Sequence, residues 1–398
     1  MPNRTIVAMP GDGIGKVVLD EAIRVLGKAG FKADYVEADI GWEFWRSEGN
    51  PLPNRTLDLI EKHKIGLFGA ITSKPKDEAF AELASELKDK ELVYSSPIVG
   101  LRQHFGLDIC LRPCRTYTGN PLNFIRRGPN NSIEEPTVDV AIFRQNTEGL
   151  YGGVEWSNPP RQVYDALMTH PKFSQNFGDA PKEEVSVSTR IFTKKYTERI
   201  IRAAFEHAKK YGYKSVTVCE KPNVIRETSG MMYKMAQQIQ KADFPSIELW
   251  NTNIDAQMMW LTKNPENYGV IVAGNMFGDI VSDGFAGLIG GLGFACSAQY
   301  NPETGIGVFE PTHGSAPKYA DYPVSIVNPI AMVESSCMML DFIDEQNIAG
   351  KIRKAVAEVV MEGKVQTYDM AKMTGQANVV AEGAASTTEM ADAIIDKL

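Results

Sequence analysis

The sequence predicts an α/β protein in which helices cover both faces of an open, mostly parallel sheet. Two observations support this prediction. Short β-type runs alternate with segments whose apolar residues recur at helical spacing. The 398 residues, 43% of them hydrophobic and 23% charged, are enough for two or three domains with sizeable cores. The same composition excludes a disordered chain, a collagen and a small disulfide-rich protein.

Each expected strand or helix is a run of periodic hydrophobic residues that ends at turn-forming residues. The expected strands are 5–9, 31–38, 66–70, 138–143, 215–219, 247–251 and 269–273. The expected helices are 16–28, 193–211, 228–241, 256–263, 329–342, 348–361 and 387–397.

Two stretches depart from the alternation. Residues 284–314 are rich in glycine, and we expect them to be irregular. Residues 152–181 contain several prolines, glycines and aromatic residues with weak periodicity. They indicate a long excursion from the main fold, a candidate dimerisation arm.

The overall charge and the cysteines exclude several classes of partner and site. Lysine and arginine number 42 against 50 acidic residues, a net charge of −8, so we expect no binding to nucleic acid. No apolar stretch approaches the ~20 residues that span a bilayer, so no membrane partner is expected. The run at 5–9 leaves no room for a signal peptide, and five scattered cysteines predict reduced thiols. We therefore expect a cytoplasmic protein.

The opening run Gly11-Asp12-Gly13-Ile14-Gly15-Lys16 invites comparison with nucleotide-binding loops. A P-loop needs four residues between its Gly and Gly-Lys and then Ser or Thr, whereas Val17 follows Lys16 here. A dinucleotide fingerprint needs a third Gly three residues after the second. The spacing therefore favours a tight strand-to-helix turn that requires flexible backbone.

Three arginines, Arg102, Arg112 and Arg144, stand beside β-type or loop sequence. Burying an arginine is costly unless its planar guanidinium meets a carboxylate or phosphate, which it binds through two hydrogen bonds. In an acidic protein, three such residues indicate a polycarboxylate or phosphate substrate. Separate structural ion pairs explain the same pattern equally well.

The acidic residues Asp279 and Asp283 lie four apart and would share one face of a helix. Like charges at this spacing repel unless a cation lies between them, and carboxylate oxygens suit Mg²⁺ or Mn²⁺. Asp255 is a candidate third ligand; a helix N-cap for Asp255 and a solvated face for the pair remain open. His313 stands in a Gly/Ser/Pro loop, where it either packs on a ligand ring or, as we favour, completes a turn.

Taken together, these motifs resemble the β-decarboxylating dehydrogenases, the family of isocitrate, homoisocitrate and 3-isopropylmalate dehydrogenases. The resemblance runs from the opening glycine motif to the C-terminal helix. Its most specific parts are Arg144-Gln-Asn-Thr-Glu-Gly-Leu-Tyr151, Lys221-Pro-Asn-Val224, Gly278-Asp-Ile-Val-Ser-Asp-Gly284 and His313-Gly-Ser-Ala-Pro317.

The resemblance implies the family's two-domain open-sheet fold, which is distinct from the Rossmann dinucleotide-binding fold. Residues 1–107 and 291–398 would form the large, cofactor-side domain. Residues 108–290 would form the small domain, with the dimer contact and a clasp-like arm at about 152–187. A homodimer with shared active sites is implied, because the family's equivalents of Lys221 and Asp255 reach into the neighbouring subunit's site.

The resemblance also assigns roles to individual residues. Tyr151 and Lys221 match the acid/base pair. The substrate residues would be Ser96, Arg102, Arg112 and Arg144. The ligands of Mg²⁺ or Mn²⁺ would be Asp255, Asp279 and Asp283. The cofactor residues would be Thr72, His313, Gly314, Ser315, Ala316, Pro317, Lys318, Tyr319, Asn328, Tyr368 and Lys372.

The implied cofactor is NADP. Members of the family that use NAD often place Asp and then Ile or Leu after the Ser-Ala-Pro equivalent, whereas Lys318 and Tyr319 follow here. Tyr368 and Lys372 match two further positions that contact the 2′-phosphate. The second is usually Arg, and lysine keeps the charge but loses the two-pronged geometry.

The implied substrate is a 2-hydroxy tricarboxylic acid, with isocitrate first, homoisocitrate second and 3-isopropylmalate a distant third. Ile98 stands where isocitrate enzymes commonly have Asn two residues after the serine, and the stretch 94–99 resembles some homoisocitrate dehydrogenases. The features of the NADP type favour isocitrate. A noncatalytic regulatory subunit is disfavoured, because the chain keeps the acid/base pair and the three aspartates.

Overall fold

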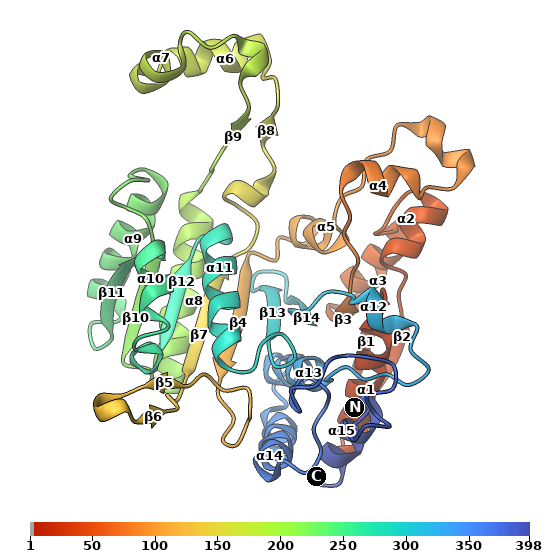
Figure 1. Cartoon of the computed structure of the whole chain (residues 1–398). Helices are drawn as coiled ribbons and strands as arrows, with labels where there is room; N and C mark the ends of the chain where they lie inside the picture. Colours follow the sequence, from red (N-terminus) through yellow and green to blue (C-terminus); the bar gives the residue numbers. More distant parts are fainter. Residues whose placement is uncertain (1–3) are drawn as a thin grey trace.

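The computed structural model describes residues 4–398 and contains one ten-stranded sheet with helices on both faces (Figure 1). The strand order is β11-β10-β12-β7-β4-β13-β14-β3-β1-β2. The strands are β1 (Arg4–Gly11), β2 (Ala33–Glu37), β3 (Ile65–Ala70), β4 (Ile109–Arg115), β7 (Asp139–Gln145), β10 (Ser215–Glu220), β11 (Glu248–Asn253), β12 (Val270–Ala273), β13 (Cys296–Asn301) and β14 (Ile306–Pro311). The predicted fold class, α/β with a mostly parallel sheet, is confirmed.

The sheet consists of two parallel blocks joined by antiparallel strands. Strands β2, β1, β3 and β14 pair in parallel at one end, and β11, β10, β12 and β7 at the other. Strand β4 is antiparallel to β7 and β13, and β13 is antiparallel to β14. The domain division stays a prediction; its boundary would fall at the β4–β13 pair, where strands from 108–290 meet strands from the two chain ends.

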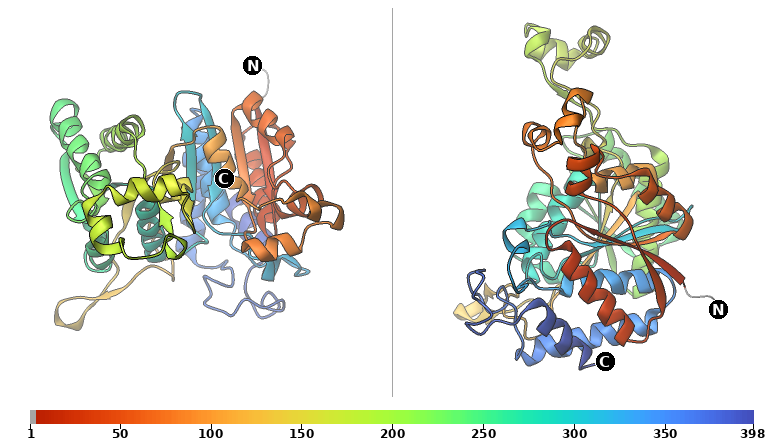
Figure 2. Two further views of the ribbon diagram at one scale, coloured as in Figure 1. Left: turned by 90° about the horizontal axis from the view of Figure 1, so that it is seen from above. Right: turned by 90° about the vertical axis from the view of Figure 1, so that its right-hand side faces the viewer.

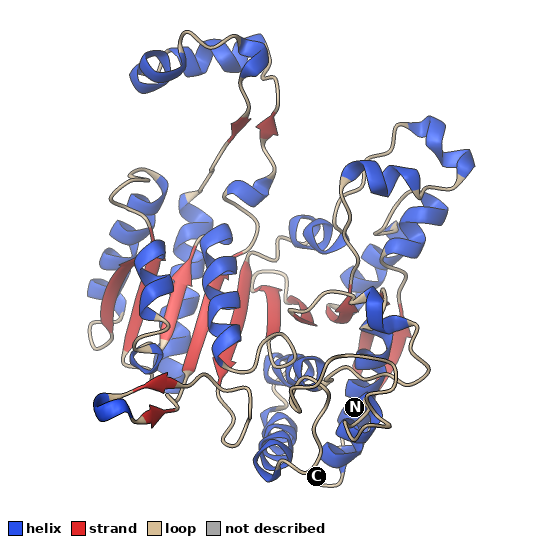
Figure 3. Ribbon diagram, viewed as in Figure 1, coloured by secondary structure: helices blue, strands red, loops and turns tan. Residues whose placement is uncertain are grey.

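Helices pack against both faces of each parallel block and bury their apolar residues there. Around the first block, α13 is buried on every side, because it lies between the sheet and two other helices, and such a helix is apolar all round. In the second block α8 and α9 cover one face and α10 and α11 the other (Figure 3). The helices are α1 (Gly15–Lys28), α2 (Trp42–Glu48), α3 (Asn54–His63), α4 (Lys76–Ala81), α5 (Pro97–His104), α8 (Lys194–Tyr211), α9 (Thr228–Asp243), α10 (Ile254–Trp260), α11 (Asn275–Leu288), α12 (Pro317–Ala320), α13 (Ile330–Phe342), α14 (Gln346–Glu362) and α15 (Thr387–Ile395).

The predicted excursion is an arm that stands clear of the sheet (Figure 2). It contains β8 (Glu155–Trp156), α6 (Arg161–Met168), α7 (Pro171–Phe177) and β9 (Val187–Ser188). Tyr164 holds its two helices together, because its ring packs edge-on against Phe173 and its hydroxyl donates to the carbonyl of Ala180. Phe177 is exposed. The role of the arm in dimerisation stays a prediction.

A second, smaller antiparallel hairpin consists of β5 (Arg126–Arg127) and β6 (Ile133–Glu134).

The expectation of irregular structure over 284–314 is wrong. Helix α11 continues to Leu288, and β13 and β14 then form a hairpin in the middle of the sheet. The glycines of this stretch lie mainly in turns: Gly290 and Gly291 follow the helix with φ of 118° and 81°, and Gly305 turns the hairpin with φ of 68°. The strands between these turns are buried, so glycine content here marks tight turns around central strands.

The cysteines and the lengths of the helices bear on two further predictions from composition. All five cysteines are free and buried, as predicted for reduced thiols. Within residues 4–398, every helix is too short or too polar to cross a bilayer.

The central position of the β13–β14 hairpin predicts a large effect of a cavity there. Phe309 on β14 is fully buried, with its ring 5.5 Å from that of Phe342. Phe309→Ala should lower the free energy of unfolding by about 3–5 kcal/mol, measured by urea denaturation followed by circular dichroism. Leu292→Ala, in the same glycine-rich stretch but 48% exposed, should change it by less than ~0.5 kcal/mol. Equal losses in the two variants would contradict the placement of β14.

Candidate functional site

Arg112 and Arg144 project from neighbouring strands on the same face of the sheet. Arg112 is in β4 and Arg144 in β7, where the register pairs Cys110 with Arg144 and Arg112 with Ile142. Both arginine side chains are buried. Helix α11 covers this face of the two strands, and α5 lies over the neighbouring block. The sheet therefore brings two of the three predicted arginines together.

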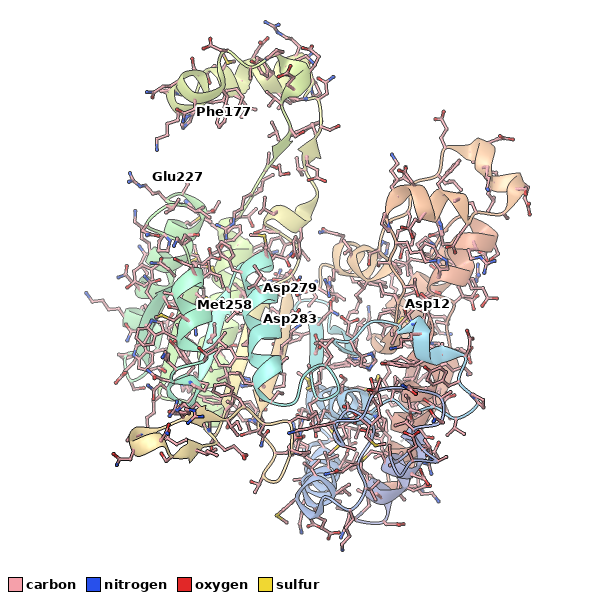
Figure 4. All side chains as sticks on the ribbon, viewed as in Figure 1. Asp12, Phe177, Glu227, Met258, Asp279 and Asp283 are labelled. Atoms are coloured by element: carbon pink, nitrogen blue, oxygen red, sulfur yellow. The ribbon has the colours of Figure 1, made fainter. Side chains whose placement is uncertain are left out.

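The acidic residues of α11 neutralise these arginines. Nη1 of Arg112 donates to Oδ1 of Asp279 at 3.0 Å and to Oδ1 of Asp283 at 3.2 Å. Arg144 also pairs with Asp279, and its Nε donates to Oδ1 of Asn275 at 2.9 Å. Asp279 and Asp283 lie together on α11, whereas Asp12 lies in the other half of the molecule (Figure 4). The predicted shared helix face is present, and the cation between the two carboxylates is Arg112.

Arg144 remains a cation within this group of ion pairs, and Nε of Arg112 offers a hydrogen-bond donor to an anion. Burial, together with the nearby Arg112 and Arg102, lowers the pKa of Arg144 to about 10, so it remains a cation at neutral pH. Nε of Arg112 is buried and has no hydrogen-bond partner among residues 4–398. A buried donor without a partner is costly, and a carboxylate would supply the missing acceptor.

Arg102 joins this group from a helix, which corrects the expectation of strand or loop sequence around it. It lies in α5, where its Nε donates to Oε1 of Gln299 at 2.5 Å and its Nη2 to Oε1 of Glu310 at 3.3 Å. Burial raises the pKa of Glu310, although Arg102 and Arg112 oppose the shift. Sequence reasoning missed Gln299 and Glu310. The available signal was an acid inside the apolar run of β14, which is as costly to bury as an unpaired arginine.

Tyr151 borders the arginine group and keeps its proton. Its hydroxyl donates to Oδ2 of Asp279 at 3.4 Å, and the guanidinium of Arg144 lies 5.6 Å from its ring centre. Burial and the neighbouring Asp279 raise the pKa of the phenol. At neutral pH it is therefore a neutral hydroxyl that can donate a proton, and it is 44% exposed.

Lys221 and Asp255 form a separate pair. Lys221 follows β10 and pairs with Asp255 at the start of α10; this hydrogen bond lowers the pKa of the carboxyl. Glu220, fully buried, accepts from Arg190 at 2.7 Å and so anchors the backbone next to Lys221. Within the described chain, no hydrogen bond or ion pair joins this pair to Tyr151 or Asp279.

A possible metal site is correspondingly divided. Residues 4–398 contain no cluster of three or more Asp, Glu, His or Cys side chains that would hold an ion within one chain. Asp279 and Asp283 offer carboxylate oxygens on one helix face, the ligand type that Mg²⁺ and Mn²⁺ prefer. The donor set fits such an ion if Asp255 is supplied from elsewhere.

Several predicted cofactor residues gather at a second place, where β3 and β14 end. Oγ1 of Thr72 and Oγ of Ser315 are 2.7 Å apart. Nδ1 of His313 lies 3.0 Å from the carbonyl oxygen of the next residue, Gly314. Burial lowers the pKa of His313, and its Nε2 has no hydrogen-bond partner in the described part of the chain. His313 is therefore a neutral ring with an unused nitrogen, which suits a ligand better than a closed turn.

The remaining cofactor candidates surround the short helix α12. Ala316, with φ of 38°, turns the chain into Pro317 at the helix start. The Lys318 ammonium lies 5.0 Å from the ring centre of Tyr319, whose ring is 5.4 Å from that of Tyr368. Asn328 donates to Asp369 at 3.3 Å.

Within the described chain, neither Lys318 nor Lys372 forms an ion pair. Both lysines are exposed, and Lys372 lies in a turn with φ of 56°.

Ser96 is the N-cap residue immediately before α5, and its side chain makes no capping hydrogen bond to the described helix. Ile98, two residues on, is 8% exposed and packs into the core beside β1 and β3. Val99 is 38% exposed. The side chain at 98 therefore turns away from the surface of α5, and Val99 is the apolar residue that this surface offers.

A large cavity lies on the opposite face of the sheet. It has a volume of about 1210 Å³, and its walls come from α8 on one side and from α13 and α14 on the other. Leu111 and Pro113, the neighbours of Arg112 in β4, line its floor together with Tyr300. No predicted site residue lines it. The same strands thus carry charged side chains on one face and an apolar floor on the other.

Comparison with known proteins assigns the family. The sequence profile described as Isocitrate/isopropylmalate dehydrogenase matches residues 5–394. Protein DlpA of Legionella pneumophila is 37% identical over 393 residues, which cover 98% of this chain but only 58% of DlpA. Homoisocitrate dehydrogenase of Methanocaldococcus jannaschii is 36% identical over 361 residues, 90% of this chain and 91% of that protein. The crystal structure of isocitrate dehydrogenase from Methylococcus capsulatus superposes with a TM-score of 0.79 at 32% identity and covers 99% of both chains. The chain therefore belongs to the isocitrate/isopropylmalate dehydrogenase family.

Proposed function

We propose that the protein is an NADP-dependent isocitrate dehydrogenase that converts isocitrate to 2-oxoglutarate. Family membership supports the reaction class, the metal-dependent oxidative decarboxylation of a hydroxy acid with a nicotinamide cofactor. The observation behind the choice of a tricarboxylic acid is the arginine group. Three arginines converge, and one of them has a buried N–H donor that no group of the described chain accepts. Homoisocitrate is the alternative, supported by the 94–99 stretch and by the relative from Methanocaldococcus jannaschii.

The roles of the residues follow from their chemistry. Arg102, Arg112 and Arg144 would bind the substrate carboxylates and orient the hydroxyl-bearing carbon. Nζ of the partner subunit's Lys221 would take the hydroxyl proton, and the Tyr151 hydroxyl would return a proton to the carbon that loses CO₂. Asp279 and Asp283, with the partner subunit's Asp255, would hold Mg²⁺ or Mn²⁺. When bound, this ion and NADP supply charge stabilisation at oxygen and hydride acceptance.

The preference for NADP rests on charge. Lys318 and Lys372 are exposed cations without carboxylate partners in the described chain, and Tyr319 and Tyr368 add phenol hydroxyls beside them. A 2′-phosphate would be attracted here, and no acid stands at 318 to bind the ribose hydroxyls of NAD.

Assays that combine each of the three candidate substrates with NAD and with NADP test the proposed substrate and cofactor. Reduced nicotinamide absorbance should rise fastest with isocitrate and NADP in the presence of Mg²⁺ or Mn²⁺, and chelation of the metal should abolish it. Comparable kcat/KM for NAD and NADP would overturn the cofactor choice. A higher kcat/KM with homoisocitrate would overturn the substrate choice.

Replacing the proton donor tests the role of Tyr151. Tyr151→Phe should lower kcat by about 10²-fold or more, because the phenol hydroxyl is lost, while the calorimetric Kd for metal and substrate stays unchanged. Tyr211→Phe removes a hydroxyl from another exposed tyrosine, remote from the arginine group, and should leave both values unchanged. An unchanged kcat in Tyr151→Phe would remove this residue from the mechanism.

Mixing two inactive variants tests the shared active site. Tyr151→Phe and Lys221→Met should each be inactive as homodimers. A dimer with one subunit of each kind has one site that keeps both native residues, so random exchange at equal amounts should restore about a quarter of the native activity. No recovery after exchange, shown by mass spectrometry of the mixed dimers, would place Tyr151 and Lys221 of one site in the same subunit.

A further inference from the structure

The Asp12 carboxylate links two segments that are distant in sequence. Its Oδ1 accepts the backbone N–H of Trp42 at 2.7 Å, and its Oδ2 accepts the backbone N–H of Thr72 at 2.8 Å. Trp42 begins α2, and Thr72 begins the segment 72–96 that connects β3 to α5. One side chain of the opening glycine motif therefore holds the first residue of this connection.

The turn that carries Asp12 is itself fixed. Its N–H donates to the carbonyl of Ala70 at 2.8 Å, and the N–H of Ile14 donates to the carbonyl of Ser315 at 2.9 Å. Gly13, with φ of +57°, passes so close that a Cβ there would lie 2.1 Å from the Ser315 oxygen. The glycines thus serve close backbone packing, and they present the carboxylate from a rigid base.

Trp42 extends the connection to the rest of the segment. Its indole Nε1 donates to Oε2 of Glu82 at 2.7 Å, beside the Glu82–Lys74 ion pair. Its ring centre lies 5.0 Å from that of Tyr94, whose hydroxyl donates to the carbonyl of Thr72 at 2.8 Å. Both ends of the 72–96 segment are therefore tied to the two groups that Asp12 holds.

We propose that Asp12 is a positioning residue that holds the 72–96 segment in place. It thereby fixes Thr72 and Ser96 relative to the cofactor residues and the arginine group. The roles of Thr72 and Ser96 rest on the proposed function. A carboxylate suits the task because both oxygens accept, and hydrogen bonds to a charged acceptor are stronger than neutral ones. An amide of the same shape would turn one N–H donor toward another, so one of the two segments would be released.

The matched pair Asp12→Asn and Asp20→Asn tests the proposal. Asp20 lies on α1 in an exposed position, where it forms an ion pair with Lys16 at 3.6 Å. Asp12→Asn should raise KM for both cofactor and substrate by about tenfold, while kcat changes by less than ~threefold, because ordering is lost and the reacting groups remain. Asp20→Asn should leave both parameters unchanged. A fall in kcat alone, with KM unchanged, would overturn the positioning role.

Limited trypsin digestion gives a readout that needs no substrate. In Asp12→Asn, cleavage after Lys76, Lys88 and Lys90 should accelerate by about tenfold relative to the native protein, with the rest of the chain protected. Native cleavage rates would overturn the proposal, as would acceleration at all sites alike. If Asp12→Asn fails to fold, Glu82→Gln, which weakens the Trp42 link, must accelerate the same three cleavages, and unchanged rates would overturn the proposal.

The two readouts separate this proposal from the function on which it rests. A native protein that oxidises none of the three hydroxy acids would contradict the proposed function. In that case, selective cleavage in Asp12→Asn would still establish that Asp12 holds the segment. An active native enzyme with unchanged cleavage and unchanged KM in Asp12→Asn would leave the function standing and remove the role of Asp12.

Discussion

Two guanidinium groups buried on one face of the central strands impose the main constraint on this molecule. Arg112 and Arg144 must meet anions, because a buried charge without a partner costs several kcal/mol. Helix α11 supplies Asp279 and Asp283, and it lies close enough only because residue 278 is glycine: a Cβ there would lie 2.8 Å from the Arg144 side chain. The position of α11 on the sheet is thus coupled to the charge balance of the arginines, and a substrate anion would enter an already organised set of charges.

Hydrophobic periodicity predicted most of the longer helices and seven of the ten strands of the main sheet, which lie within a few residues of their expected limits. It did not predict the shorter helices α2, α3 and α5 or the strand β4. It failed at the β13–β14 hairpin, where closely spaced glycines suggested irregular chain. Periodicity describes local amphipathicity, whereas the position of a hairpin at the centre of a sheet depends on pairing with distant strands. Arg102 was misplaced for a related reason: the short helix α5 has a weak apolar pattern, and its identity depends on packing against β1 and β3.

The candidate site was predictable to different degrees. The pairing of Asp279 with Asp283 on one helix face follows from spacing, and the structure supplies the cation between them. The roles of Tyr151 and Lys221 came from the family resemblance, because spacing alone carries no information about which strand ends meet. The separation of the Lys221–Asp255 pair from Asp279 is a property of one chain, and a sequence does not show which contacts a second subunit would complete. The role of Asp12 could not be predicted for another reason. Its partners are backbone N–H groups, which every residue except proline has, so the sequence does not identify them.

The strand order also affects how the protein can fold during translation. Strands β3 and β4 follow one another along the chain, yet β14 and β13 lie between them in the sheet. As the nascent chain emerges, each parallel block can begin its own ladder, but the two ladders remain unjoined until residues 296–311 have left the exit tunnel. Helix α13, which covers the apolar face of β14 and packs on α1, emerges later still. Biosynthesis therefore includes a long interval with bare sheet edges and an uncovered core, the stage at which aggregation competes with folding.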